Sequence, residues 1–203
     1  FSDAISSESR NGVVFPGTRC PYMAANVDFS GDEDLVQRIG TDGDDARRMG
    51  GQVAGSAIVR VGNEFVGLVG ASTPQLPNIT TTGDLTVAGS TTTISELAAE
   101  IQPEIDALTA TGIDKIILLS HMQQIDIERA LAQVLTGVDV IVAGGSNTRM
   151  GDATDTLFPG DSAFAENYPF STSDADGDTT LIVNVDGDYK YLGRLVVAFD
   201  EAG

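Results

Sequence analysis

The 203-residue chain is poor in basic residues, in cysteine and in histidine. It has 11 Lys and Arg against 30 Asp and Glu, which gives a formal net charge of −19. Such a surface repels phosphate groups, which argues against nucleic acid and anionic membranes as partners. Cys20 is the single cysteine, so an internal disulfide and a paired-cysteine zinc site are excluded. His121 is the single histidine.

Long apolar runs are also lacking. No run approaches the roughly 20 residues that a membrane-spanning helix needs. The chain opens at Phe1 without an initiator Met or a signal-peptide pattern, and we therefore expect a processed or truncated product. Its length and its 41% hydrophobic content predict one α/β module over residues 1–203 with a real core.

The most informative stretch runs from Ile113 to Asn147. It contains two apolar runs, Lys115–Leu119 and Val138–Ala143, which have the length and bounds of buried strands. Between them lies a helical stripe, which Gly137 ends. The stripe consists of Ile127, Ala130, Leu131, Val134 and Leu135. This order predicts a βαβ unit with parallel strands, and ligands bind beyond the carboxyl ends of such strands.

The flanking regions predict one hairpin and one helix. Ser56–Val61 and Phe65–Val69 are β-branched runs separated by a compact turn at Gly62-Asn63-Glu64. A helix is expected over about Ser95–Thr111, with a capping box from Thr93 to Glu96 and Pro103 inside it.

Near the C-terminus, Thr180–Val185 and Tyr189–Phe199 predict a second hairpin across Asp186-Gly187-Asp188. Residues 73–90 and 151–178 have the composition of long loops. The predicted fold class is therefore α/β, with a mixed, largely parallel sheet, a βαβ unit and a C-terminal β-hairpin.

Two features at the predicted strand ends can carry chemistry. His121 stands where a metal ligand or an acid–base group is usual in this architecture, although a histidine can also merely cap a strand. Gly144-Gly145-Ser146-Asn147 can present backbone N–H groups to an anion, or can be an ordinary glycine turn.

An acidic motif at residues 174–178, DADGD, resembles the first half of an EF-hand calcium loop. The match then fails, because Thr179 and Val185 stand where that loop needs Gly and Glu. A looser calcium site and a solvated acidic turn both remain open. The acidic cluster Asp42–Asp45 leaves the same choice.

Several segments together resemble a known family. They are PYMAANVDFSG, FVGLVGASTPQLPN, GIDKIILLSH, GVDVIVAGGSN and TTLIVNVDGDYKYLGRLVVAFD. In this order they resemble the 5′-nucleotidase branch of the calcineurin-like metallophosphoesterases, including 2′,3′-cyclic-nucleotide phosphodiesterases and atypical alkaline phosphatases. The resemblance covers most of the chain and implies part of a four-layer α/β/β/α sandwich.

The resemblance implies a phosphoester hydrolase with two divalent metal ions, of which Zn, Mn or Ca are the candidates. The histidine that ends LLSH binds one metal in that pattern, and here it is His121. The next motif of the family places metal-binding side chains at the positions of Gly145 and Asn147. The histidine expected at the first is absent, and Asn147 is a weaker oxygen donor.

The earlier ligand motifs of the family, Asp-x-His, Gly-Asp-x-x-Asp and Gly-Asn-His-Glu, are absent, and Gly62-Asn63-Glu64 only mimics the last. We therefore expect Phe1 to lie just downstream of them, in the C-terminal portion of a catalytic domain that has negligible activity by itself. Its partners would be the rest of the parent protein and a nucleotide or other phosphorylated small molecule, and the family implies an extracellular or periplasmic location. The alternative is a non-catalytic cation-binding or interaction module with a degenerate metallophosphoesterase fold.

Overall fold

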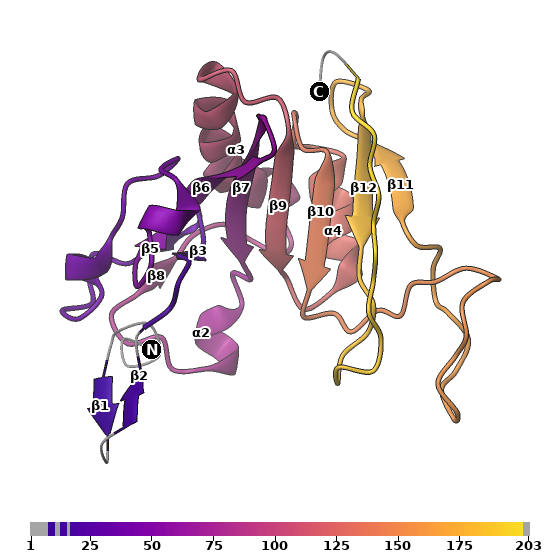
Figure 1. Cartoon of the computed structure of the whole chain (residues 1–203), viewed down its shortest axis with the longest axis horizontal. Helices are drawn as coiled ribbons and strands as arrows, with labels where there is room; N and C mark the ends of the chain where they lie inside the picture. Colours follow the sequence, from indigo (N-terminus) through magenta and orange to yellow (C-terminus); the bar gives the residue numbers. More distant parts are fainter. Residues whose placement is uncertain (1–7, 11–12, 16, 201–203) are drawn as a thin grey trace.

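A six-stranded mixed sheet forms the centre of the molecule (Figure 1). The computed structural model describes residues 8–10, 13–15 and 17–200. The strand order is β11-β12-β10-β9-β7-β6, in which the four inner strands run parallel and the two edge strands antiparallel. The strands are β6 (Ser56–Val61), β7 (Glu64–Ser72), β9 (Ile116–His121), β10 (Val140–Gly144), β11 (Phe170–Ser173) and β12 (Thr179–Val183). The predicted α/β class with a largely parallel sheet is confirmed.

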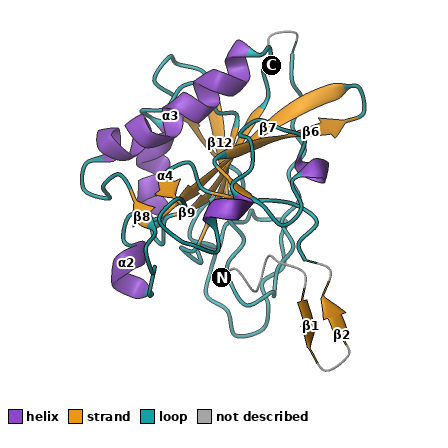
Figure 2. Cartoon of the chain, turned by 90° about the vertical axis from the view of Figure 1, so that its left-hand side faces the viewer, coloured by secondary structure: helices purple, strands orange, loops and turns teal. Residues whose placement is uncertain are grey.

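The predicted βαβ unit and first hairpin are present. Helix α4 (Ile125–Ala132) connects β9 to β10, whose register pairs Val140 with Ile117 and Gly144 with His121. The β6–β7 hairpin turns at Gly62, which has a φ of 65°. Helices α3 (Ile94–Ala110) and α4 cover the same face of the sheet (Figures 1 and 2). The main core lies between these helices and the sheet.

Helix α3 buries the predicted stripe, including Leu97, Ile101, Ile105 and Leu108. Its predicted capping box is wrong, because the Thr93 side chain makes no capping hydrogen bond. Ser90 instead orders the turn that precedes the helix, since its Oγ accepts hydrogen bonds from the backbone N–H groups of residues 92 and 93, each at 3.1 Å.

Helix α4 differs from its predicted stripe at two positions. Val134 is 42% exposed and lies beyond the last residue of the helix, whereas Glu128 is fully buried. The sequence shows why on inspection: Glu128, Leu131, Ala132 and Leu135 are spaced as one helical face. The buried face of α4 therefore includes a charged residue, which the predicted apolar stripe does not contain.

The predicted C-terminal hairpin is wrong in its second strand. Strand β12 pairs with β10 on one side and with β11 on the other, so neither of its edges is free for residues 189–199. The hairpin of this region is β11–β12, turning through residues 174–178. Residues 184–200 instead run across the sheet face opposite the helices (Figure 1). Tyr189, Leu192 and Val196 are exposed along this segment.

Short elements lie outside the six-stranded sheet. They are β1 (Glu8–Arg10), β2 (Val13–Phe15), β3 (Tyr22–Met23), β4 (Val27–Asp28), η1 (Val36–Arg38), η2 (Ala46–Arg48), β5 (Val53–Ala54), α2 (Leu76–Ile79) and β8 (Thr86–Val87). Their strands pair as three separate two-stranded sheets, β1–β2, β3–β5 and β4–β8. Residues 73–90, predicted as a long loop, thus contain α2 and β8. Buried Asn26 ties this segment to the sheet, since its amide donates to the carbonyls of Ser72 and Ala88 and its Oδ1 accepts from the Ser72 N–H. Within the described residues, no helix has the length and apolar character needed to cross a membrane.

Candidate functional site

The carboxyl ends of β7, β9 and β10 meet at one edge of the sheet. Register places Ser72 beside His121, and His121 beside Gly144. The structure thus brings the predicted histidine and the predicted glycine turn together, because parallel neighbours end at the same edge.

His121 is exposed, while its backbone is held firmly within the sheet. Ser120 and Met122, on either side of it, are buried. Side chains alternate between the two faces of a strand, so Ser120 points toward the helices and His121 toward the opposite face. The His121 carbonyl also accepts a hydrogen bond of 3.0 Å from the Thr73 N–H.

Glu128 lies beneath this strand end. Its Oε1 accepts hydrogen bonds from the Ser120 hydroxyl and from the Met122 N–H, each at 3.1 Å. Burial raises the pKa of the Glu128 carboxyl to about 7, although both hydrogen bonds act to lower that pKa. Its Oε2 has no hydrogen-bond partner among the residues that the structure describes. The sequence-based prediction missed this residue.

Gly145 lies against the His121 ring. Its φ is 83°, and a Cβ added there would stand 2.8 Å from His121 Cδ2 and Nε2. Any larger residue at position 145 would therefore need the ring to shift and would also adopt a strained backbone. The glycine brings the β10 turn into contact with the histidine.

Asn147, the second predicted ligand, has a φ of 52° and lies close to Gly187. It lines a cavity of about 600 Å³, whereas His121 lines a neighbouring cavity of about 850 Å³. Val142 and Gly144 border both cavities. The two predicted ligands thus stand on adjacent sides of the β10 end and do not share one cavity.

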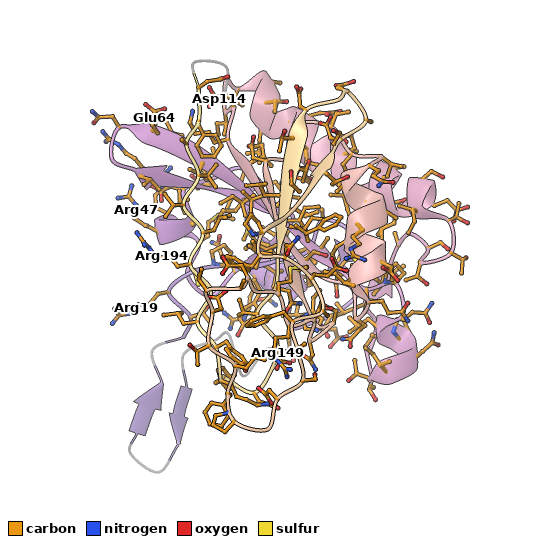
Figure 3. All side chains as sticks on the ribbon, turned by 90° about the vertical axis from the view of Figure 1, so that its right-hand side faces the viewer. Arg19, Arg47, Glu64, Asp114, Arg149 and Arg194 are labelled. Carbon is orange, nitrogen blue, oxygen red and sulfur yellow. The ribbon has the colours of Figure 1, made fainter. Side chains whose placement is uncertain are left out.

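A polar cluster supports the Asn147 side of this edge. The Arg149 guanidinium binds the Asp186 carboxylate at 2.6 Å and donates to the Ser162 carbonyl at 2.9 Å. The Tyr191 hydroxyl donates to the Asp161 carboxylate at 2.6 Å. These contacts tie the 149–162 loop to the C-terminal segment, and Figure 3 shows Arg149 at the end of the molecule away from Glu64 and Asp114.

The DADGD motif lies at the other edge of the sheet, because it precedes β12. Asp174 is buried, and its Oδ1 accepts from the N–H groups of Asp176 and Asp178 at 2.9 Å each. Its Oδ2 accepts from the Gly137 N–H at 3.2 Å. Asp174 therefore builds the hairpin turn, and among the described residues no group of three or more His, Cys, Asp or Glu is placed to hold a metal ion.

The acidic cluster at 42–45 also has structural partners. Asp42 accepts from the Gly55 N–H, Asp44 pairs with Arg48, and Asp45 pairs with Arg47. The hydrogen bonds from Arg47 lower the pKa of Asp45 to about 2.

Comparison with known proteins found 5′-nucleotidases among the relatives of this chain. No family model matches the chain. The 5′-nucleotidase of Bos taurus is 33% identical over 169 residues, which cover 83% of this chain and 28% of the relative. Snake venom 5′-nucleotidase of Naja atra is 32% identical over 196 residues, covering 95% of this chain and 33% of the relative.

The chain also resembles solved structures. A 5′-nucleotidase precursor from Thermus thermophilus superposes with a TM-score of 0.62 at 29% identity, over 79% of this chain and 27% of that one. The NAD nucleotidase of Haemophilus influenzae shares the fold, with a TM-score of 0.58 at 23% identity over 80% of this chain and 28% of that one.

These matches define a hydrolase family with an α/β fold. The chain belongs to the 5′-nucleotidase family. It spans about a third or less of the length of the curated relatives it matches.

The predicted ligands fit a divalent cation only as part of a larger donor set. His121 offers an imidazole nitrogen and Asn147 an amide oxygen, both of which such ions accept. Two donors on adjacent sides of a strand cannot enclose two metals. A two-metal site of the kind that the family resemblance implies would need further ligands from outside the described residues.

Proposed function

We propose that the chain is the C-terminal portion of a metal-dependent phosphoester hydrolase domain that acts on nucleotides. Its His121 would bind one of two divalent metal ions, with Asn147 as a weaker second donor. The observation that carries the proposal is the position of His121, exposed at the carboxyl edge of the sheet and in contact with the Gly145 turn, in a chain whose relatives are 5′-nucleotidases.

The face of the sheet opposite the helices, which the C-terminal segment covers only in part, supports an incomplete domain. Leu119 and Val142 are 36% and 42% exposed on the face opposite the helices, where a buried parallel sheet would need a second layer. A second sheet from the parent protein would cover this face, complete the four-layer sandwich and supply the missing metal ligands. An extracellular or periplasmic location is proposed on the family resemblance alone.

We expect the isolated chain to have negligible phosphatase activity, because it supplies at most two ligands of a two-metal site. The assay is turnover of p-nitrophenyl phosphate and of nucleoside monophosphates with added Mn²⁺, Zn²⁺ or Ca²⁺. Metal-dependent turnover that His121→Ala abolishes would show that the chain is active by itself. The same substitution in the parent protein should lower kcat/KM.

The second candidate is a non-catalytic module that kept the fold and lost the metals. The glycine at position 145, where the resembled family has a histidine, favours it. Reading the coding sequence upstream of Phe1 distinguishes the two. The motifs Asp-x-His, Gly-Asp-x-x-Asp and Gly-Asn-His-Glu are expected there for an enzyme, and their absence would favour the module.

A further inference from the structure

We propose that Glu128 is a positioning residue that fixes the direction of the His121 ring. The inference rests on the proposed function, in that the ring direction matters because His121 binds a metal. Its geometric part concerns only the folded chain and can be tested separately.

The hydrogen bonds of Glu128 fall on both neighbours of the histidine. A single oxygen, Oε1, accepts from the Ser120 hydroxyl and from the Met122 N–H, so the carboxyl group bridges the strand end below His121. The Met122 bond lies just past the end of β9, where sheet pairing no longer holds the backbone. Because His121 lies between these two residues, the bridge adds an anchor on the helix side of the strand end, where pairing with β7 and β10 already holds the His121 backbone.

Burying the Glu128 carboxyl group costs free energy, so a contribution to stability does not by itself explain why a glutamate stands here. Glu128 has no exposed surface, and its Oε2 is left without a partner among the described residues. An apolar residue on this helical face would avoid the desolvation of a carboxyl group. The remaining contacts of the strand end are generic backbone pairing, including the Thr73 N–H to His121 carbonyl bond. Glu128 adds to the apolar packing of Met122 against α4 a pair of hydrogen bonds that reach both residues beside the histidine.

The ring has a defined neighbour that reports its direction. Gly145 lies so close that an added Cβ would stand 2.8 Å from the ring atoms Cδ2 and Nε2. His121 is also the only histidine of the chain, so its imidazole signals in an NMR spectrum need no assignment.

The experiment compares Glu128→Gln, Glu128→Asp and Glu128→Leu in the 203-residue chain. Gln keeps an oxygen acceptor at the same reach, Asp keeps the carboxyl group but is one methylene shorter, and Leu removes the acceptor. We measure the nuclear Overhauser effect between the ring and the Gly145 α-protons, and the change of the imidazole signals during a Zn²⁺ titration. The unaltered chain and Glu128→Gln should show the Overhauser contact, whereas Asp and Leu should weaken it. Zn²⁺ affinity at His121 should fall by about 10- to 100-fold in Asp and Leu, as for other residues that orient metal-bound histidines.

Leu108→Ala is the matched control for general loss of stability. Leu108 is buried in α3 beside the start of β9, at the other end of the strand from His121. The Leu108→Ala substitution should lower the melting temperature while leaving the Overhauser contact and the Zn²⁺ affinity unchanged.

The proposal is overturned if a folded Glu128→Leu or Glu128→Asp keeps the Overhauser contact, or if Glu128→Gln loses it as fully as Leu does. If Glu128→Leu does not fold, the comparison of Asp with Gln decides. If Zn²⁺ does not change the imidazole signals of the unaltered chain, the proposal that His121 binds a metal in this chain is wrong. The Overhauser contact then decides the positioning role by itself.

Discussion

At the scale of single residues, Glu128 combines a buried carboxyl group with a pKa raised to about 7. An ordinary glutamate in the unfolded chain has a pKa near 4.5. The folded state therefore holds a proton more tightly than the unfolded state. The resulting stability is fully present below the unfolded pKa and is lost as pH rises through 7.

We predict that Glu128→Gln removes this pH dependence. Relative to the variant, the unaltered chain should lose about 2–3 kcal/mol of unfolding free energy between pH 5 and pH 8, because each pKa unit corresponds to about 1.4 kcal/mol. Urea denaturation of both proteins across that interval measures the difference. Parallel stability curves would show that Glu128 is ionised in the fold throughout.

The sequence predicted His121 and the Gly145 turn at this edge, because both follow apolar runs and strand ends meet in a parallel sheet. It did not predict that their side chains and backbone touch. Nor did it place Asn147 in a separate cavity, since that depends on the left-handed backbone of residues 145 and 147.

At the scale of elements, Asp174 organises the β11–β12 hairpin. Its carboxylate accepts hydrogen bonds from two N–H groups of its own turn and from the N–H group of Gly137. Gly137 lies in the connection between α4 and β10. One side chain thus joins two connections of the sheet.

We predict that Asp174→Ala destabilises the chain by about 2–4 kcal/mol, because it removes three charge-assisted hydrogen bonds to backbone N–H groups. Asp176→Ala, an exposed change in the same turn, should cost less than about 0.5 kcal/mol. Chemical denaturation measures both. Calcium should not stabilise the chain, and a calcium-dependent rise in unfolding free energy that Asp174→Ala abolishes would instead identify DADGD as a metal site.

Element prediction succeeded where neighbours in sequence are neighbours in space. The β6–β7 hairpin and the βαβ unit are of this kind. Tyr189–Phe199 has the composition of a strand, yet β12 already has a partner on each side, so this segment has no edge to join. The composition of a segment reflects its tendency to adopt an extended backbone. Whether a neighbouring strand has a free edge with which that segment can pair depends on the whole sheet.

At the scale of the molecule, the charge of −19 acts against the fold through self-repulsion. The ion pairs at residues 44–48 and 149–186 offset this only locally. Added salt screens the long-range repulsion, since the Debye length falls from about 10 Å at 0.1 M to about 3 Å at 1 M.

We predict that the melting temperature rises by on the order of 5 °C between 0.1 M and 1 M NaCl, equivalent to about 2 kcal/mol for a chain of this size. A variant that neutralises three exposed carboxylates, Glu33→Gln, Asp84→Asn and Glu100→Gln, should show a smaller rise. Differential scanning calorimetry measures both. An equal response of the two proteins would attribute the effect to hydrophobic burial, which salt also strengthens.

The sequence by itself determined the α/β class, the βαβ unit, the first hairpin and the edge at which His121 stands, because each depends on local periodicity and on the rule that parallel strands end together. Only the tertiary structure decided which residues meet there. Glu128 reaches back from α4 to both neighbours of His121, Gly145 makes room for the ring, and the C-terminal segment crosses the sheet face instead of pairing. The physical reason is that hydrogen-bond partners, free edges and close contacts are set by how the elements pack, and no local pattern of residues records that packing.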